Sequence, residues 1–324
     1  MSIDAPYLRQ TLLEAASEGD IDVILETLEN GASIDGLVNS VEPGSGFTAL
    51  HHACVRGDIE LACFLLRHGS VTDVCDKFRK TPLHYACHFG HTQVAFVLLD
   101  SGRVDVQKLY DNNEAKLTCL QTAAARGHTT ILHLLLVHGD SVDGPNEAGE
   151  TALHLAAAEN HFDAVVVLLR CGADIAARTP QGDSPLHYAC RAGAMSTASL
   201  LVRLGVSIHL TNTDDPPRSC LEMARVFGHS VLANAIIAEA QQRRDLLTGE
   251  DAVRVRAATA ALEIARATCL EAQARVKEQR AAAAWAQKVD ERRAIGLYLH
   301  DVRTGKSILE ALRAFDAFPH LQKV

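Results

Sequence analysis

Residues 77–102 read KFRKTPLHYACHFGHTQVAFVLLDSG, and the fold can be worked out from this stretch. Thr81-Pro82-Leu83-His84 predicts the start of a helix, because proline at the first helical position loses no intrahelical hydrogen bond. Gly90 predicts the end of that helix, since glycine favours the left-handed conformation of a helix C-terminus. A second helix is expected before Gly102, with apolar side chains at helical spacing: Val94, Val97, Leu98 and Leu99. Two helices this short cannot bury a core alone, so they require stacked copies.

The copies are present at intervals of 33 to 37 residues. Their equivalent opening residues are Thr48, Thr81, Thr118, Thr151, Ser184 and Ser219. His, Gln or Glu follows three places later, Gly or Asn nine places later, and Leu or Ile seventeen places later. A more divergent copy starts near Gln10. The sequence therefore predicts seven units between about residues 10 and 240.

This pattern resembles the ankyrin repeat family. The signature is carried by TPLH at 81–84 and SPLH at 184–187, and TALH at 151–154 nearly matches it. The resemblance implies an all-α solenoid of helix-turn-helix repeats with short β-hairpin fingers, which we assign to residues 1–240. It also implies that partners bind the fingers and the concave face of the first helices. The unit at Thr118 departs from the family with Cys119 and Gln121, but its apolar positions are kept, so we expect it to fold.

The C-terminal residues have a different composition. Gly249 and Gly296 enclose 46 residues without Gly or Pro, rich in Ala, Arg, Glu and Gln, which predicts a long Ala-rich helix over 241–296. A heptad seam for contact with a helix recurs every seven residues at Val255, Leu262, Cys269 and Val276. The seam could meet another helix or fold back on the solenoid, and the sequence leaves both open. A connector and a short amphipathic helix are expected over 297–324.

Charge divides the chain into the same two parts. Residues 1–240 carry 16 Lys and Arg against 29 Asp and Glu, a formal charge of −13, whereas residues 241–324 carry +4. An acidic solenoid argues against nucleic-acid binding by the repeats. No apolar run is long enough to span a bilayer, and the first residues show no signal-peptide pattern. We therefore expect a cytoplasmic protein with no membrane partner, and a cytoskeletal, ciliary or nuclear setting stays open.

Cysteine and histidine are numerous, but the repeat accounts for many of them. Cys54, Cys87 and Cys190 share one position where other copies carry Ala, which predicts reduced thiols in the core. Eight of the 16 histidines fall at two repeat positions, so we expect no metal and no cofactor. A Cys- or His-dependent enzyme is an alternative, but no catalytic motif supports it. We expect neither catalysis nor a small-molecule substrate.

The remaining candidate chemistry is a binding surface. Basic and aromatic side chains stand at finger and first-helix positions of an otherwise acidic solenoid, which is typical of binding hot spots. The predicted partner-binding residues are Phe47, Arg56, Lys77, Phe78, Lys80, His88, Phe89, Arg126 and Arg191. They predict an adaptor or scaffold for another protein with an acidic segment, in which the C-terminal helices make a second contact or join a larger assembly.

A substrate-recognition subunit of a ubiquitin ligase is the main alternative function. Some ankyrin proteins carry a C-terminal box for that purpose, and Ser307–Val324 has a suitable length. This stretch lacks the Leu-Pro-x-Pro pattern expected of such a box.

Overall fold

The computed structural model describes residues 5–29, 37–102, 104, 117–214, 216–248, 260, 263–268, 270–276 and 278–279. The chain divides into two compact units, Met1–Gln273 and Ala274–Val324. Of the second unit, the described residues 274–276 and 278–279 are helical. The predicted connector and terminal helix over 297–324, and with them the candidate ubiquitin-ligase box, lie outside the described residues. So do the seam residues Val255, Leu262 and Cys269.

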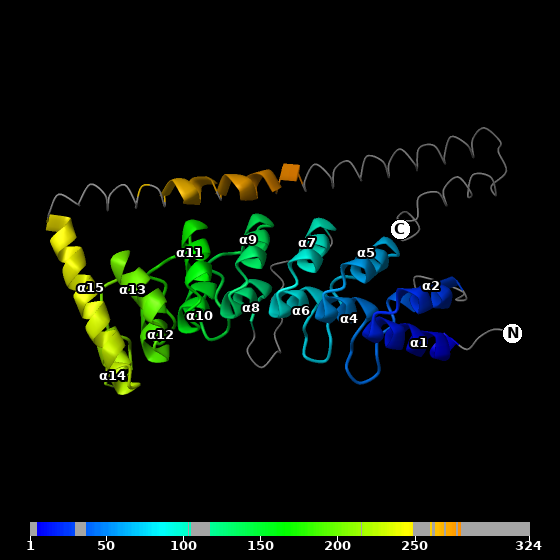
Figure 1. The fold of residues 1–324 in the computed structure, drawn as a ribbon, viewed down its shortest axis with the longest axis horizontal. Helices are drawn as coiled ribbons and strands as arrows, with labels where there is room; N and C mark the ends of the chain where they lie inside the picture. The colour runs from blue at the N-terminus through cyan, green and yellow to red at the C-terminus, as the bar shows by residue number, and fades with distance from the viewer. Residues whose placement is uncertain are drawn as a thin grey trace. The chain divides into compact units, whose positions relative to one another are not determined.

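The described part of the first unit forms seven helix pairs (Figure 1). They are α1 (Ala5–Glu18) with α2 (Ile21–Glu29), α4 (Ala49–Arg56) with α5 (Ile59–Arg67), α6 (Pro82–Phe89) with α7 (Thr92–Asp100), α8 (Cys119–Arg126) with α9 (Thr129–Val137), α10 (Ala152–Ala158) with α11 (Phe162–Arg170), α12 (Pro185–Ala192) with α13 (Met195–Arg203), and α14 (Cys220–Val226) with α15 (Ser230–Thr248). The predicted all-α solenoid is confirmed. The first helix starts earlier than the predicted unit near Gln10, because Leu8 is already buried in the core.

The helices lie in two rows. Figure 1 shows the first helices of the pairs in one row and the second helices in the other, with the finger loops along the edge of the first row. Each helix packs on its equivalents in the neighbouring repeats, as α6 packs on α4 and α8. Alanines such as Ala86 and Ala123 are fully buried in the first row, and leucines such as Leu98 and Leu135 in the second. Small residues in the first row allow close packing there, so each repeat stacks on the next with a dry core.

The finger of the third repeat is a tight turn, and the described residues contain no strand, although Thr211 and Ser219 form an isolated antiparallel bridge. In this finger, Asp76 N–H donates to the Lys80 carbonyl at 3.0 Å. The Asp76 carboxylate then accepts from Phe78 N–H at 2.9 Å and from Lys80 N–H at 2.7 Å. Side-chain bonds thus replace the next rung of a hairpin ladder, which is why the expected β-hairpin is reduced to a turn.

In the second, fourth and fifth repeats, a buried side chain three places after the opening residue joins that repeat to the next; these residues are His51, Gln121 and His154. In the second repeat, His51 Nδ1 accepts from Thr48 N–H at 3.1 Å and His51 Nε2 meets the Lys80 carbonyl at 3.1 Å. Gln121 does the same in the fourth repeat: Oε1 accepts from Thr118 N–H at 3.0 Å and Nε2 donates to the Glu150 carbonyl at 3.2 Å. The expectation that this divergent unit folds is confirmed.

A second set of histidines packs on the glycines that end the first helices. His128 Nε2 lies 3.3 Å from the His88 carbonyl, and its ring covers Gly90. Gly90 has a φ of +80°, and a Cβ placed there would lie 2.6 Å from the His128 ring. Two features therefore require glycine at position 90: the left-handed backbone, and the close packing of the His128 ring, which leaves no room for a Cβ. His91 and His161 repeat this arrangement with the carbonyls of Val55 and Ala125.

The last helix pair ends the array. Ala240 stands where a glycine closes the other units, so the sequence predicts that the second helix can continue. The structure agrees, because α15 runs 19 residues to Thr248. The guanidinium of Arg203 on α13 donates to both carboxylate oxygens of Glu239 on α15, at 2.8 and 2.7 Å. Among the described residues, no helix has both the length and the apolar character needed to cross a membrane.

Candidate partner-binding surface

A hollow of about 660 Å³ opens between the third and fourth repeats. It is bounded by the finger over 76–80, by α6 and α8, and by the residue that follows α10. The lining residues are Phe78, Lys80, His84, Tyr85, His88, Leu117, Thr122, Ala125, Arg126 and Glu159. Four of the nine predicted partner-binding residues therefore meet in one cavity, namely Phe78, Lys80, His88 and Arg126.

The finger holds Phe78 at its tip. The two backbone bonds to the Asp76 carboxylate fix the turn, and Arg79 takes a left-handed φ of 57°. Phe78 remains 49% exposed beside the hollow, and Lys77 Nζ lies 5.1 Å from the centre of its ring. A rigid turn that presents a half-exposed aromatic ring offers apolar contact area with little loss of conformational entropy on binding.

One wall of the hollow is basic. Lys80 Nζ lies 5.7 Å from the centre of the Tyr85 ring, and Arg126 Nη2 lies 3.3 Å from His88 Nε2. Burial lowers the pKa of His88, and the nearby charges of Arg126, Lys80 and His128 lower it further. His88 is thus held neutral and accepts from Arg126, which leaves the positive charges of Lys80 and Arg126 facing the hollow.

The hollow is also lined by one carboxylate. Glu159 is exposed, and it follows α10 at the same repeat position that Arg126 occupies in the fourth repeat. Within the described part of the chain, Glu159 has no ion pair. The hollow therefore offers an aromatic ring, a basic wall and one acidic rim residue to a bound segment.

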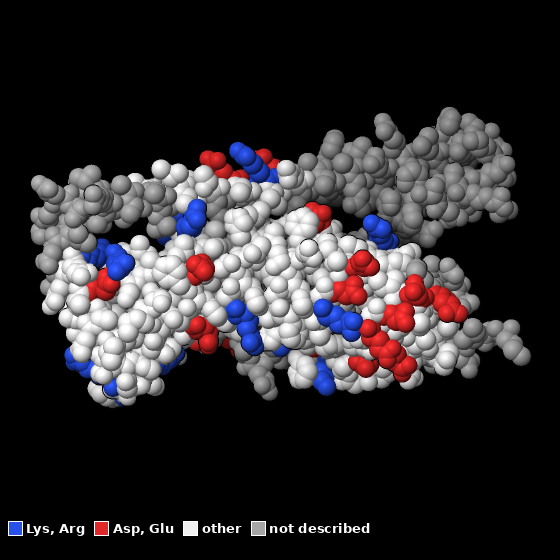
Figure 2. All heavy atoms as spheres, viewed as in Figure 1, with Lys and Arg blue, Asp and Glu red and all other residues white. Residues whose placement is uncertain are grey.

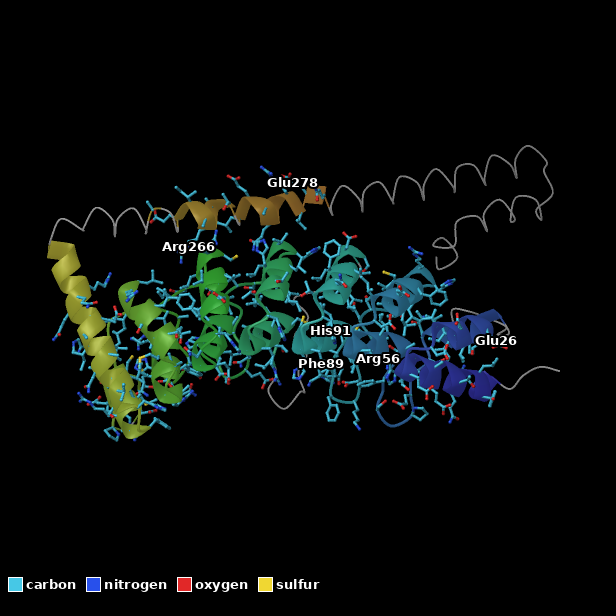
Figure 3. The ribbon with its side chains drawn as sticks, in the orientation of Figure 1. Glu26, Arg56, Phe89, His91, Arg266 and Glu278 are labelled. Atoms are coloured by element: carbon cyan, nitrogen blue, oxygen red, sulfur yellow. The ribbon has the colours of Figure 1, made fainter. Side chains whose placement is uncertain are left out.

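The other predicted residues lie elsewhere. The Phe47 ring packs on the rings of His51 and Tyr85, each with centroids 5.2 Å apart, so it supports the hollow from behind. Arg56 Nη1 donates to the Ser17 carbonyl at the end of α1, at 3.1 Å. Phe89 is 49% exposed and lies against the ring of His88 but does not line the hollow. Figure 3 labels Arg56, Phe89 and His91 on neighbouring repeats.

Arg191 is held by its own repeat. Its guanidinium carbon lies 4.3 Å from the centre of the Tyr188 ring, and Nη1 lies 3.9 Å from the Asp183 carboxylate. The Tyr188 hydroxyl donates to Glu150 at 2.6 Å, and burial together with this bond raises the pKa of Tyr188 to about 12. Arg191 is therefore part of a network with the carboxylates of Asp183 and Glu150. Because its charge is already paired there, the basic residues that face a partner are those around the hollow.

The sequence reasoning missed the side chains at the fourth place after each opening residue. Tyr85 and Thr122 occupy this place in the third and fourth repeats, and both line the hollow. Tyr188 occupies it in the sixth repeat. A tyrosine repeated at one variable position was the signal available, because such a residue points away from the core that the repeat keeps constant.

The described residues contain no cluster of side chains able to hold a metal ion. The nearest approach to a nucleophile pair is Cys220 Sγ, 3.4 Å from His187 Nδ1. A hydrogen bond with Cys190 and burial raise the pKa of the Cys220 thiol far above its ordinary range, and Cys220 is fully buried. A neutral, inaccessible thiol is a packing residue rather than a nucleophile.

Acidic side chains gather at the N-terminal end of the solenoid. Figure 2 shows Asp and Glu concentrated over the first helices of the chain on the viewed face. A shallow depression there is lined by Glu18, Asp20, Asp22 and Glu60. The basic wall of the hollow therefore stands out against an acidic surface on the same solenoid.

Comparison with known proteins gives one family. The family model described as ankyrin repeats (3 copies) matches residues 12–110, 104–179 and 120–214. Among solved structures, the crystal structure of the human ASB11 ankyrin repeat domain is 27% identical to the chain with a TM-score of 0.61. The match covers 70% of this chain and 96% of that one. No curated protein matches the chain.

Proposed function

Because the chain belongs to the ankyrin repeat family, we propose that it is an adaptor or scaffold that binds a segment of another protein in the hollow between its third and fourth repeats. Ankyrin repeats are protein-interaction modules and are generally not enzymes. The observation that carries the proposal is the convergence of Phe78, Lys80, His88 and Arg126 on one cavity. In this proposal the C-terminal helices supply a second contact, within an intracellular, reducing setting.

The chemistry of the hollow defines the partner segment. Lys80 and Arg126 would pair with carboxylates, and Phe78 with Tyr85 would pack against an apolar side chain. Glu159 would favour a donor or a cation farther along the segment. We therefore propose an acidic segment with one apolar anchor.

A random peptide library displayed on phage tests this proposal with the full chain as the immobilised target. We expect enrichment of peptides with Asp or Glu flanking one aromatic or aliphatic residue. A selected peptide should then bind Phe78→Ala about 30-fold more weakly than the parent, because truncation of a hot-spot aromatic costs about 2 kcal/mol. Fluorescence anisotropy of the labelled peptide measures this change.

Matched controls separate the hollow from the rest of the surface. Phe96→Ala removes a ring of nearly equal exposure, 48%, from α7, and Arg67→Glu reverses an exposed charge on α5, which does not line the hollow. Both controls should bind like the parent. Enrichment of peptides without acidic residues would refute the partner chemistry, and equal binding by the parent and by Phe78→Ala would refute the site.

A further inference from the structure

The C-terminal helix contacts the solenoid within the first unit through two side chains, Arg266 and Gln273. Arg266 Nη2 donates to the Ala173 carbonyl at 3.1 Å and Nε to the Leu169 carbonyl at 3.4 Å, beyond the end of α11 and at its last turn. Gln273 Nε2 donates to the Leu136 carbonyl in the last turn of α9, at 2.8 Å. Figure 3 labels Arg266. These contacts involve none of the residues that line the hollow.

The two contacts are equivalent by repeat. Leu136 and Leu169 both stand eighteen places after the opening residue of their repeat, and Arg266 and Gln273 stand seven residues apart. Seven residues of α-helix rise about 10.5 Å, and packed helices lie about 8–10 Å apart. One heptad of the C-terminal helix therefore spans about one repeat, so the contact that Arg266 makes with the fifth repeat recurs at Gln273 with the fourth.

The carbonyls are suited to such donors. The Leu136 and Leu169 carbonyls accept from the N–H groups of Gly139 and Gly172, at 3.1 and 3.2 Å, and each oxygen has a second lone pair for a further donor. The helix dipole also places negative charge at this end of the helix. Arg266 brings a positive charge to this end of α11 and also acts on Asp143 nearby. Ala265 and Ala272 stand three places after the seam residues Leu262 and Cys269 and so share the face of the heptad seam. Both are half-buried, and their small side chains leave room for a close approach.

We propose that the heptad seam of the C-terminal helix is a ligand for the chain's own second helices, engaged at one heptad per repeat, and not a coiled-coil surface for a second copy. The rise of one heptad along the C-terminal helix then matches the spacing between neighbouring second helices of the solenoid. Ile264 and Leu270 are 66% and 61% exposed on the same helix. Under this proposal those two residues, rather than the seam, are available to other proteins.

A photo-cross-link in the full-length chain tests the proposal. A diazirine side chain placed at Ala272 should form, on irradiation, an intramolecular product with the segment at the end of α9, identified by mass spectrometry. Placed at Glu271, which is exposed, it should give no such product. Arg266→Leu with Gln273→Leu should lower the Ala272 yield roughly tenfold, because the hydrogen bonds to the carbonyls are lost. Thr268→Leu with Glu271→Leu, changed on the exposed side, should leave the yield unchanged.

Several outcomes would overturn the proposal. A product of dimer mass, with a yield that rises with protein concentration, would show that the seam pairs two copies. An Ala272 yield that is the same in the Arg266→Leu, Gln273→Leu variant would show that the two donors do not hold the helix. The absence of any solenoid product in the parent would also refute it.

Discussion

The neutral ring of His51 makes one hydrogen bond within its own repeat and one to the next. Nδ1 accepts from the Thr48 backbone, so Nε2 carries the proton and donates to the Lys80 carbonyl. Protonation of Nδ1 would turn this nitrogen into a donor facing the Thr48 N–H, and it would place a positive charge in the core. Burial accordingly lowers the pKa of His51 to about 4, although the Lys80 carbonyl acts in the opposite direction.

His51 should therefore make the stability of the protein sensitive to acid. The unfolded chain takes up a proton near pH 6.5 and the folded chain near pH 4, so between these values the unfolded state binds more protons. The free energy of unfolding should then fall as the pH drops through this window, by about 3 kcal/mol from this residue. Urea unfolding followed by circular dichroism at pH 7.5, 5.5 and 4 measures the slope.

His51→Gln is the control that the chain itself supplies, because Gln121 makes both bonds at the equivalent position, to Thr118 N–H and to the Glu150 carbonyl. The variant should fold and should lose this part of the slope. His52 and His154, whose pKa burial also lowers, contribute to both proteins and cancel in the difference. Equal slopes for parent and variant would show that His51 is not the titrating group.

The junction between the fifth and sixth repeats differs from the neighbouring junctions at two positions that contact each other there, the glycine and the histidine of the next repeat. Asn160 stands where other repeats have glycine, at a φ of 55°, and the histidine of the next repeat is replaced by Ala194. Asn160 Oδ1 accepts from Thr197 N–H at 3.2 Å, and the Thr197 hydroxyl donates to the Ala157 carbonyl at 3.1 Å. Without the ring there is room for a side chain, and asparagine tolerates the left-handed backbone.

The turn between helices α6 and α7 should contribute to the free energy of unfolding through Gly90. Gly90→Ala places a Cβ at a φ of +80° and 2.6 Å from the His128 ring, so it should strain the backbone and displace a ring that joins two repeats. We expect a loss of about 2 kcal/mol, from the left-handed backbone and the disturbed contact together. Urea unfolding of the variant measures it.

Gly139→Ala provides the comparison. Its φ is +93°, and no atom lies within 4 Å of a Cβ built there, so it should suffer only the backbone cost. Gly90→Ala should thus be the more destabilised of the two. If the two variants unfold at the same urea concentration, the contact between His128 and Gly90 adds nothing to stability.

Elements could be predicted from the sequence because the repeat constrains them. Thr81-Pro82 and Gly90 mark the ends of α6 in the sequence, and the structure places α6 over Pro82–Phe89. The finger could not be predicted as well, because its form depends on which atoms the Asp76 carboxylate accepts from. A carboxylate at a turn is compatible with a hairpin or with a side-chain-closed turn, and only the geometry distinguishes them.

The candidate site was only partly predictable for a related reason. Lys80 and Arg126 were found because they are basic in an acidic solenoid, but Arg191 was found by the same criterion and is held by Asp183 and Tyr188. Charge in a sequence does not show which partners a side chain already has. Tyr85 was missed because an aromatic residue inside a helix is usually read as core, whereas the hollow exposes its edge.

For the whole molecule, the hollow is a small basic region on an acidic body. Residues 1–240 carry −13, while Lys80 and Arg126 stand together at the hollow. Charges act over about 30 Å at 0.01 M salt and about 8 Å at 0.15 M. An acidic peptide should therefore be repelled by the body at low salt and attracted by the hollow once the body is screened.

The association rate of an acidic peptide should pass through a maximum as salt is raised. From about 0.01 M to about 0.1 M the rate should increase as the repulsion is screened, and toward 1 M it should decrease as the attraction of Lys80 and Arg126 is screened in turn. Arg126→Glu should remove the maximum and leave a rate that only increases with salt. Arg67→Glu has the same net charge as that variant but an unaltered hollow, so it should keep the maximum. Stopped-flow fluorescence with one peptide and the three proteins measures these curves, and a parent rate that decreases steadily from the lowest salt would contradict the prediction.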